Sequence, residues 1–504
     1  MNLFYNPFTT YAPIIIKMFN FSYTNSLKIF ASICIILSGI TMYNCCNYIT
    51  KNKVLSLFVS IMYLVCPYKL GDTFKRFALG KFASFIFLPI LFQGLYSLLN
   101  DGGKKHYCIA IGTTGLILTH TITTFYAIFF CLLYVLFNIN KVVERKILKM
   151  ILINLVFIIL MSAFYTIPLL EAKYTTNYMI FDNQYMKTNN KYVYSNTLDL
   201  ISFFIDSSKY TDAVYLIGIP FVILSFLTIT TYKKINTNYR KSYLIALCFA
   251  IIALYVSTKY FPWFIMPNYL CILQFPWRML TYFSFFISFI AGTNLYILIR
   301  NLKLKYIIKL FISILTITFI IIYALYIILN YMIVKYPNVS NTDLENRLLY
   351  DSNVNLIYNM EYMPKNSYIN YDYIQKKEDK IYFLNGSADI LYENKNGIAY
   401  NARLTNIVDK TLIEFPLFYY PGYEIKVYDN KNIKKLNIIE TKNGLIGVEL
   451  PENNNIINIS LNYVGTSLTY ISYVTTLLGI IIFIIYIKKI HKGYLQTIYE
   501  RKNK

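Results

Sequence analysis

Charged residues are scarce in this chain of 504 residues, because Asp, Glu, Lys and Arg together make up only 14% of it. Soluble domains carry about 25% charge, so the composition argues against a water-soluble enzyme. Hydrophobic residues instead reach 56%. The 51 Tyr and 37 Phe match what an AT-rich coding sequence would leave, so we give their number little functional weight.

Histidine is rarer still, and cysteine is missing from the most polar part of the chain. The three histidines, His106, His120 and His491, are too scattered to predict a three-His metal site. None of the eight cysteines falls in the block 335–465, and no CxxC pair occurs, so we expect no disulfide framework. The pair Cys45-Cys46 is compatible with helix packing or with lipidation, and helix packing is the ordinary interpretation. Walker, GxSxG and HExxH motifs are also missing from the sequence.

The excess of basic residues behind the net charge of +23 is confined to particular segments. Block 335–465 holds 14 basic and 16 acidic residues, whereas the rest of the chain holds 34 basic and 9 acidic ones. Most of that excess lies in short segments between apolar runs, which is where Lys and Arg mark the cytoplasmic side of a membrane protein. The basic balance therefore indicates membrane topology, and we expect no nucleic-acid partner.

The apolar runs predict a mainly α, polytopic membrane protein with about eleven transmembrane helices, since a bilayer needs roughly 20 apolar residues per crossing. The stretch 107–138 is interpreted as a hairpin of two short helices that meet near His120, because both of its flanks are basic. The expected spans are 26–49, 54–68, 82–99, 107–119, 121–138, 149–170, 213–232, 242–257, 278–299, 306–332 and 468–487.

Four regions follow from this topology. Residues 1–25 are expected to form an extracytoplasmic loop or interfacial segment, and residues 26–334 the multi-helix membrane domain. Block 335–465 is expected outside the membrane, and residues 466–504 form the last span and a basic cytoplasmic tail. An odd number of crossings with the C-terminus inside places the N-terminus outside, yet residues 1–25 lack a signal peptide. We therefore expect that an upstream helix precedes this sequence, unaided translocation being the alternative.

Block 335–465 changes character from the rest of the chain. Its short alternating runs KIYFLNG, IIETKNGLIGVELP and NIINISLNYVG are separated by Gly, Asn and Pro. Period-two alternation between turn residues predicts strands, so we expect a β-sandwich or jelly-roll. Residues 340–380 are more polar and are expected to form a helix or a loop.

Residues that carry chemistry are sought at the outer ends of the predicted helices, where charge is costly unless it is used or paired. The segment 69–81, KLGDTFKRFALGK, places Asp72 and Arg76 beside a helix start. Arg76 can hold a phosphate bidentately. The alternative is an amphipathic interfacial helix whose basic side chains snorkel to the surface.

Three further residues are candidates. His120 either satisfies the hairpin turn or contacts a phosphate or sugar. Arg278, in LQFPWRML, either anchors a helix at the interface or meets a lipid phosphate, and we favour the phosphate. A carboxylate base is expected to be Asp72 or Glu171, although no spacing singles out either of them. The remaining acidic residues of the same face are Asp182 and Asp206.

These segments occur in an order that resembles a known family. The order is FYNPFTTYAP, CPYKLGDTFKRFALGKF, LILTH, SAFYTIPLLE and LQFPWRML, followed late in the chain by EFPLFYYPGYEIKV, GLIGVELP and YVGT. It is similar to bacterial polytopic membrane proteins labelled "6-pyruvoyl-tetrahydropterin synthase-related". Those proteins are in turn similar to YfhO-like proteins of the GT-C glycosyltransferase superfamily.

The resemblance implies a GT-C-like membrane core and an extracytoplasmic β domain in the cell membrane of a Gram-positive bacterium. It also implies transfer of a sugar from a polyprenyl-phosphate carrier to a cell-envelope glycan acceptor, with membrane lipid as a further partner. Arg76, His120 and Arg278 match the outer-face positions of that family. No cofactor is implied with certainty, and a divalent metal is left open.

This sequence departs from the family pattern in two respects, and these departures support an alternative function. Relatives commonly carry an acidic residue where Lys81 stands here, and the first outer loop, which usually carries the catalytic carboxylate, is absent from this sequence. The alternative is an inactive or truncated envelope protein that binds a lipid carrier or acts as a scaffold. A secondary transporter would require inverted repeats and broken helices in both halves, which the sequence does not display.

Overall fold

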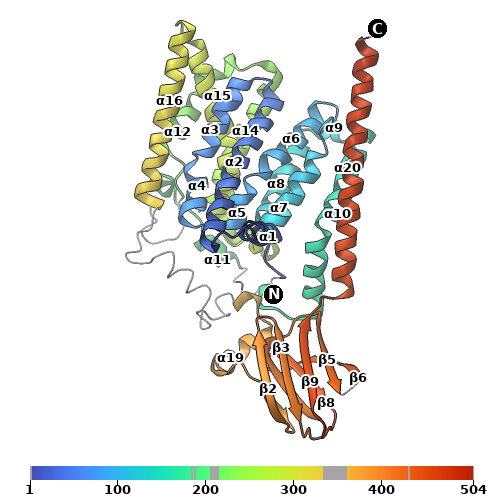
Figure 1. Cartoon of the computed structure of the whole chain (residues 1–504). Coiled ribbons are helices and arrows are strands. Elements are labelled where there is room, and N and C mark those ends of the chain that lie inside the picture. The colour runs from blue at the N-terminus through green and yellow to red at the C-terminus, as the bar shows by residue number, and fades with distance from the viewer. Residues whose placement is uncertain are drawn as a thin grey trace. The chain divides into compact units, whose positions relative to one another are not determined.

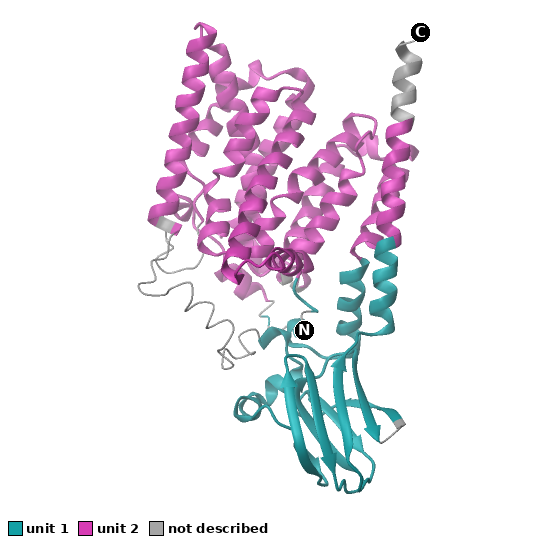
Figure 2. Cartoon of the chain, viewed as in Figure 1, with its two compact units in different colours: residues 1–5, 163–187, 347–477 teal, residues 6–162, 188–346, 478–504 magenta. Residues whose placement is uncertain are grey.

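The computed structural model of the chain describes residues 3–182, 186, 189–204, 215–332, 360–429 and 432–502. The chain divides into two compact units, shown in two colours in Figure 2. The first, here called the β unit, comprises residues 1–5, 163–187 and 347–477. The second, the helical unit, comprises residues 6–162, 188–346 and 478–504.

The helical unit contains most of the helices labelled in Figure 1. Its α-helices are α1 (Pro7–Lys17), α2 (Tyr23–Thr50), α3 (Lys53–Leu64), α4 (Pro67–Leu70), α5 (Leu79–Ser84), α6 (Phe87–Asn100), α7 (Cys108–Thr119), α8 (Thr121–Leu136), α9 (Ile139–Val142), α11 (Asn190–Ser195), α12 (Ile219–Phe226), α13 (Thr228–Thr231), α14 (Thr237–Ser257), α15 (Leu280–Asn301) and α16 (Tyr306–Ile327). Two long helices, α10 (Arg145–Thr175) and α20 (Ser467–Lys502), are divided between the two units.

Shorter helical turns connect these helices. The π-helical turns are η1 (Gly71–Lys75) and η8 (Ile328–Met332), and the 3₁₀ turns of the helical unit are η3 (Leu200–Phe203), η4 (Tyr232–Lys234), η5 (Trp263–Ile265), η6 (Asn268–Leu273) and η7 (Pro276–Met279). The β unit holds η2 (Met179–Phe181), η9 (Met360–Tyr362), α18 (Lys365–Ile369) and α19 (Tyr371–Lys376).

Seven helices in the described part of the chain are long and apolar enough to cross a membrane. They are Tyr23–Thr50, Leu79–Asn100, Arg145–Thr175, Thr237–Ser257, Pro276–Arg300, Tyr306–Asn330 and Ser467–Lys492. An eighth arises if the pair Lys53–Leu64 and Pro67–Lys75, bent by 49°, is one span. The prediction of a mainly helical protein with helices long and apolar enough to span a membrane is confirmed, whereas the count of about eleven helices is not.

The difference in count comes from four predicted spans, of which 54–68 corresponds to the bent pair just described. The hairpin 107–138 does break at His120, but it forms helices of only 12 and 16 residues. The predicted span 213–232 contains only the short helices α12 and α13 and the turn η4. Gly218, with a φ of +83°, and Pro220 set the helix start at Ile219, and the helix is interrupted again at Leu227. Apolar composition alone does not reveal such breaks.

Helix α15 lies at the centre of the helical unit, with α3, α12 and α14 packed around it (Figure 1). The span Pro276–Arg300 is 89% buried, against 17% for Tyr306–Asn330, which places the second helix at the periphery. Gly292 of α15 allows α3 to approach closely, since a Cβ there would lie 2.6 Å from the Cα of Val59. Small residues serve this purpose in membrane helix packing.

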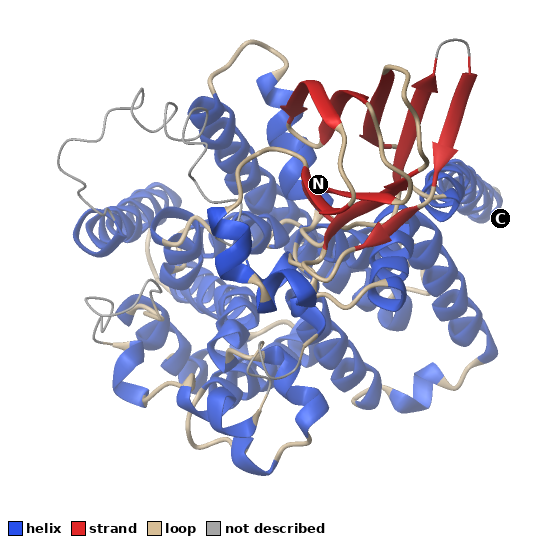
Figure 3. Ribbon diagram, turned by 90° about the horizontal axis from the view of Figure 1, so that it is seen from below, coloured by secondary structure: helices blue, strands red, loops and turns tan. Residues whose placement is uncertain are grey.

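The β unit contains two antiparallel sheets, drawn in red in Figure 3. One has the strand order β1-β4-β8-β7 and the other the order β2-β3-β9-β5-β6. The strands are β1 (Tyr382–Asn385), β2 (Asp389–Asn396), β3 (Ala399–Thr405), β4 (Thr411–Phe418), β5 (Tyr423–Asp429), β6 (Asn432–Leu436), β7 (Ile438–Glu440), β8 (Leu445–Leu450) and β9 (Ile457–Tyr463).

Apolar residues from both sheets form one shared core, which includes Phe415 and Val448 from one sheet and Leu404 and Leu461 from the other. This is a β-sandwich arrangement, so the prediction of a β domain within 335–465 is confirmed. The alternating runs quoted above form β1, β7, β8 and β9. Of the polar stretch 340–380, residues 360–376 are mostly helical and residues 340–359 lie outside the described part.

Candidate functional site

The segment 69–81 folds as a broken helix. α4 continues into the π-helical turn η1, residues 76–78 leave the helix with Phe77 at a φ of +46°, and α5 begins at Leu79. Lys69, Asp72 and Lys81 are all buried, with exposed fractions of 2%, 1% and 2%. The alternative of an interfacial helix with snorkelling basic side chains is therefore wrong for these lysines.

Asp72 forms ion pairs with two cations. Its Oδ1 lies 2.8 Å from Nη1 of Arg76, and its Oδ2 lies 3.0 Å from Nζ of Lys81. The Asp72 and Lys81 side chains are almost fully buried, whereas Arg76 retains 22% exposure. Asp72 thus serves to neutralise two cations, and this position does not single it out as the catalytic base.

An aromatic frame surrounds these cations. The ring centre of Trp277 lies 4.6 Å from the guanidinium carbon of Arg76 and 4.7 Å from Nζ of Lys81. Lys81 also donates a hydrogen bond to the hydroxyl group of Tyr68. Cation–π contacts strengthen when water is excluded, and Trp277 is only 6% exposed. The indole thereby holds two cations side by side.

Arg278 adds a third cation to the same place. Its guanidinium carbon lies 4.6 Å from the ring centre of Phe275, and its charge acts on Asp72 and Arg76. Its Nη1 is buried and has no hydrogen-bond partner among the described residues. A buried charged donor without a partner is costly, so the position is suited to an anion that would accept this hydrogen bond.

His120 lies at the junction of α7 and α8 and caps α8. Its Nδ1 accepts a hydrogen bond from the backbone N–H of Thr123 at 3.1 Å, so a neutral ring carries its proton on Nε2. A Cβ on Gly80 would lie 2.3 Å from the carbonyl oxygen of Thr119 and 3.5 Å from Cδ2 of His120. Gly80 thus lets α5 approach the imidazole, and the charges of Lys81 and Arg278 act on it.

The structure therefore brings four of the five predicted site residues together with Lys81. We call this set the cationic cluster: Asp72, Arg76, Lys81, His120 and Arg278. With a neutral His120, it carries three positive charges and one negative charge, and its imidazole and guanidinium groups are hydrogen-bond donors. This combination fits a phosphate group, whose charge near neutral pH is about −1.5 to −2.

The other acidic candidates lie elsewhere. Glu171 belongs to the β unit, where it accepts a hydrogen bond from the Thr466 hydroxyl at 2.7 Å. Asp182 is in the same unit and lies 2.8 Å from Lys365 Nζ. Asp206 is outside the described residues. Within the described part, no three His, Cys, Asp or Glu side chains gather as metal ligands.

Sequence reasoning missed two members of this site and the role of a third. The sequence places Lys81 in the same charged segment as Asp72 and as a departure from a family pattern, and the structure pairs it with Asp72. Tyr68 and Trp277 were not proposed as site residues, although both contact Lys81. The available signal was that Trp277 and Arg278 are adjacent and that the segment 66–82 contains four more cations.

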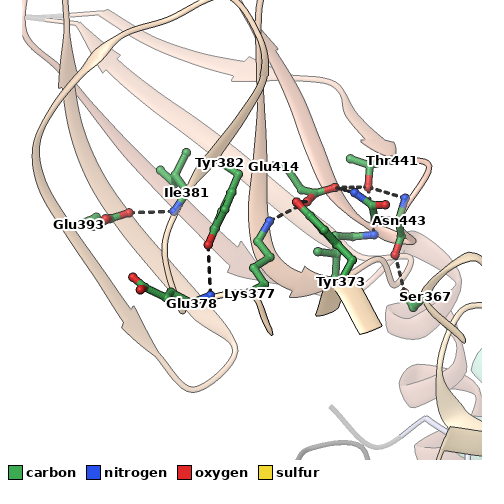
Figure 4. A network of polar contacts seen from close by, with 11 residues as sticks. Ser367, Tyr373, Lys377, Glu378, Ile381, Tyr382, Glu393, Glu414, Thr441 and Asn443 are labelled. Carbon is green, nitrogen blue, oxygen red and sulfur yellow. Dashed lines mark hydrogen bonds and ion pairs between the residues drawn. The ribbon is translucent and has the colours of Figure 1, made fainter. Parts of the chain in front are cut away.

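A second buried polar network lies in the β unit (Figure 4). Glu414 of β4 is fully buried, and its Oε1 accepts hydrogen bonds from Lys377 at 2.6 Å and Tyr373 at 2.9 Å. Its Oε2 accepts from Thr441 at 2.6 Å and Asn443 at 3.0 Å. Burial alone would raise the pKa of Glu414, but these hydrogen bonds and the charge of Lys377 outweigh it and lower that pKa below its ordinary value.

Comparison with known proteins identifies a similar chain in Lactococcus lactis subsp. cremoris, described only as an uncharacterized protein. The two are 25% identical over 275 residues, which is 52% of this chain and 44% of the relative. The chain thus spans less than half of the relative's length. No protein-family model matches the sequence, and no solved structure matches it.

Proposed function

We propose that this chain is a multi-pass membrane protein whose cationic cluster binds the phosphate of a polyprenyl-phosphate-linked sugar. The observation that carries the proposal is the buried Nη1 of Arg278, which lacks a hydrogen-bond partner among the described residues beside two further cations. An Arg guanidinium can bind a phosphate bidentately. Intramembrane cations are retained at such cost mainly where they act on a ligand or an ion.

The position of the cluster along the chain supports a lipid ligand. Arg278 directly precedes α15, and Lys81 lies in the apolar span Leu79–Asn100. An anion that reaches these residues in a bilayer is most readily the head group of an isoprenoid or acyl lipid. The distribution of Lys and Arg among the loops supports an outer-face position for the cluster, and the same argument supports an extracytoplasmic β unit.

The reaction that fits this ligand is transfer of the sugar to a cell-envelope glycan, as in the GT-C superfamily that the sequence resembles. In such a transfer the cations would stabilise the phosphate as it leaves. The base that deprotonates the acceptor hydroxyl is not assigned, because Asp72 is held by Arg76 and Lys81. That engagement favours, as a second candidate, a protein that binds the lipid carrier without transferring its sugar.

The test is binding of a polyprenyl phosphate to the full chain in nanodiscs. We expect Arg278→Gln to weaken binding about thirtyfold or more, since removal of one member of a buried charge contact costs about 2 kcal/mol or more. Arg300→Gln is the matched control, because Arg300 is an exposed arginine at the opposite end of the same helix. Equal binding by wild type and Arg278→Gln would overturn the proposal.

A transfer assay separates the two candidates. Membranes that contain the wild-type chain and a radiolabelled polyprenyl-phosphate sugar should yield labelled envelope glycan, and Arg278→Gln should abolish it. Binding without any labelled product would leave the carrier-binding function. Full transfer by Arg278→Gln would contradict the assignment of the site.

A further inference from the structure

A groove of about 410 Å³ lies in the β unit and is independent of the cationic cluster. It is lined by residues 419–424, 435–438 and 464–465, and we call it the tyrosine groove. Its volume is within the range of about 300–1,000 Å³ that is typical of small-ligand sites. The late motifs EFPLFYYPGYEIKV and YVGT, which the phosphate site leaves unexplained, converge on this groove.

Two glycines leave bare backbone between the walls of the groove. The carbonyl oxygen of Gly422 accepts hydrogen bonds from the N–H groups of Val464 at 2.8 Å and Gly465 at 3.0 Å. Gly422 has a φ of +102°, and a Cβ on it would lie 2.8 Å from the Cα of Gly465. Both the conformation and the close approach exclude a larger residue at position 422, so the two backbone segments that line the groove pack directly on each other.

The tyrosines of the groove are held in place from behind. The Tyr420 ring stacks on Tyr178 with the ring centres 5.4 Å apart, and its hydroxyl donates to the carbonyl oxygen of Tyr362 at 2.9 Å. The ring of Tyr423 meets Tyr463 edge-on at 5.4 Å. Both Tyr420 and Tyr423 remain partly exposed. Tyrosines that are held in this way offer an apolar surface at a small cost in conformational entropy.

The rim of the groove is polar, but its positive and negative charges balance. Glu424 forms an ion pair with Lys435, which lies across the β5–β6 pairing, and a second one with Lys426. Asn437 adds an exposed amide. Carboxylate, ammonium and amide groups together supply acceptors and donors of hydrogen bonds. Because Glu424 and Lys435 neutralise each other, the rim offers a phosphate no net positive charge, and an acyl chain would leave these polar groups without partners.

We infer that the tyrosine groove binds a saccharide chain. A sugar ring has an apolar C–H face that can lie on tyrosine and neutral hydroxyl groups at its edge that can bond to Glu424, Lys435 and Asn437. The further identification of this saccharide as the acceptor of sugar transfer rests on the proposed function, whereas its binding does not.

The experiment is capture of the full chain, in detergent, on a glycan array that carries oligosaccharides of neutral hexoses, deoxyhexoses and N-acetylhexosamines. We expect capture on a subset of these, and Tyr423→Ala should weaken it about tenfold or more, as for other anchoring tyrosines. Tyr392→Ala is the matched control, because Tyr392 is 54% exposed on β2 and outside the groove. No polyprenyl phosphate is added, so failure of the phosphate site leaves this readout intact.

A second variant guards against a folding defect in Tyr423→Ala, since Tyr423 also packs on Tyr463. Asn437→Ala changes only an exposed side chain of the groove and should also reduce capture. Capture on no glycan, or capture that neither variant changes, would overturn the inference. Binding to phosphatidylcholine–phosphatidylglycerol vesicles that Tyr423→Ala abolishes, without glycan capture, would assign the groove to lipid instead and would equally overturn it.

Discussion

Asp72 of the helical unit and Glu414 of the β unit are both buried carboxylates, yet their surroundings differ. Glu414 meets one cation, Lys377, and three neutral donors that satisfy both of its oxygens. Asp72 meets two cations, and Arg278 beside them contributes a further charge that no second carboxylate in the described part of the chain balances. The balanced network is complete without a ligand, whereas the unbalanced one gains from an anion. Charge balance, more than burial, therefore separates a structural polar cluster from a candidate binding site.

The largest expected effect tests the balanced network. Glu414→Ala leaves Lys377, which is 3% exposed, buried without a counter-charge, and should destabilise the β unit by about 3–5 kcal/mol. Hydrogen exchange of strands β4 and β8 in the full chain would measure the change. Exposed Glu449→Ala on the neighbouring strand is the control and should change stability by less than about 0.5 kcal/mol. Unchanged protection in Glu414→Ala would contradict the structural role.

Removing a buried charge from the cationic cluster should have the opposite effect on stability. Arg278→Met removes a cation whose buried Nη1 has no hydrogen-bond partner among the described residues, so the helical unit should be as stable as the wild type or up to about 1 kcal/mol more stable, while phosphate-lipid binding falls. Both tryptophans, Trp263 and Trp277, lie in the helical unit, so thermal unfolding followed by tryptophan fluorescence reports on it alone. Strong destabilisation by Arg278→Met would make the cluster a structural network like that of Glu414.

The sequence predicted the parts of the fold that depend on composition over a long window. Apolar runs of about 20 residues became helices such as α14 and α15, and alternating runs became β8 and β9. The span 213–232 failed, because a local break at Gly218 and Pro220 divides an apolar run without changing its mean hydropathy. Mean hydropathy over a long window does not register such a break, whereas the basic flanks of 107–138 did predict the one at His120.

The candidate site was predicted only in part for a related reason. Asp72 and Arg76 are four residues apart, a spacing that a helical turn brings together. Asp72 and Lys81 are nine residues apart, a spacing that no regular helix pairs, and only the break at residues 76–78 joins them. Arg278 comes from a distant segment. Its partners depend on tertiary packing, so the sequence supplied the residue and its charge but not its neighbours.

The smallest expected effect concerns pH and again sets the two carboxylates apart. Since the folded β unit lowers the pKa of Glu414 below the ordinary value of 4.5, the ionised carboxylate stabilises the unit at every pH above about 4.5. This contribution is lost as the pH falls below 4.5 and through the lowered pKa. In that range the unfolded chain binds a proton at Glu414 more readily than the folded state does, and this difference favours unfolding. Proton-linked loss of stability should therefore begin below pH 4.5, and hydrogen exchange of β4 between pH 6 and pH 3 would measure it.

Glu414→Gln removes the titrating group and should flatten the dependence of β4 exchange on pH. Asp72→Asn, in the helical unit, should leave that dependence unchanged. An equally steep dependence in Glu414→Gln would assign the acid sensitivity to other carboxylates.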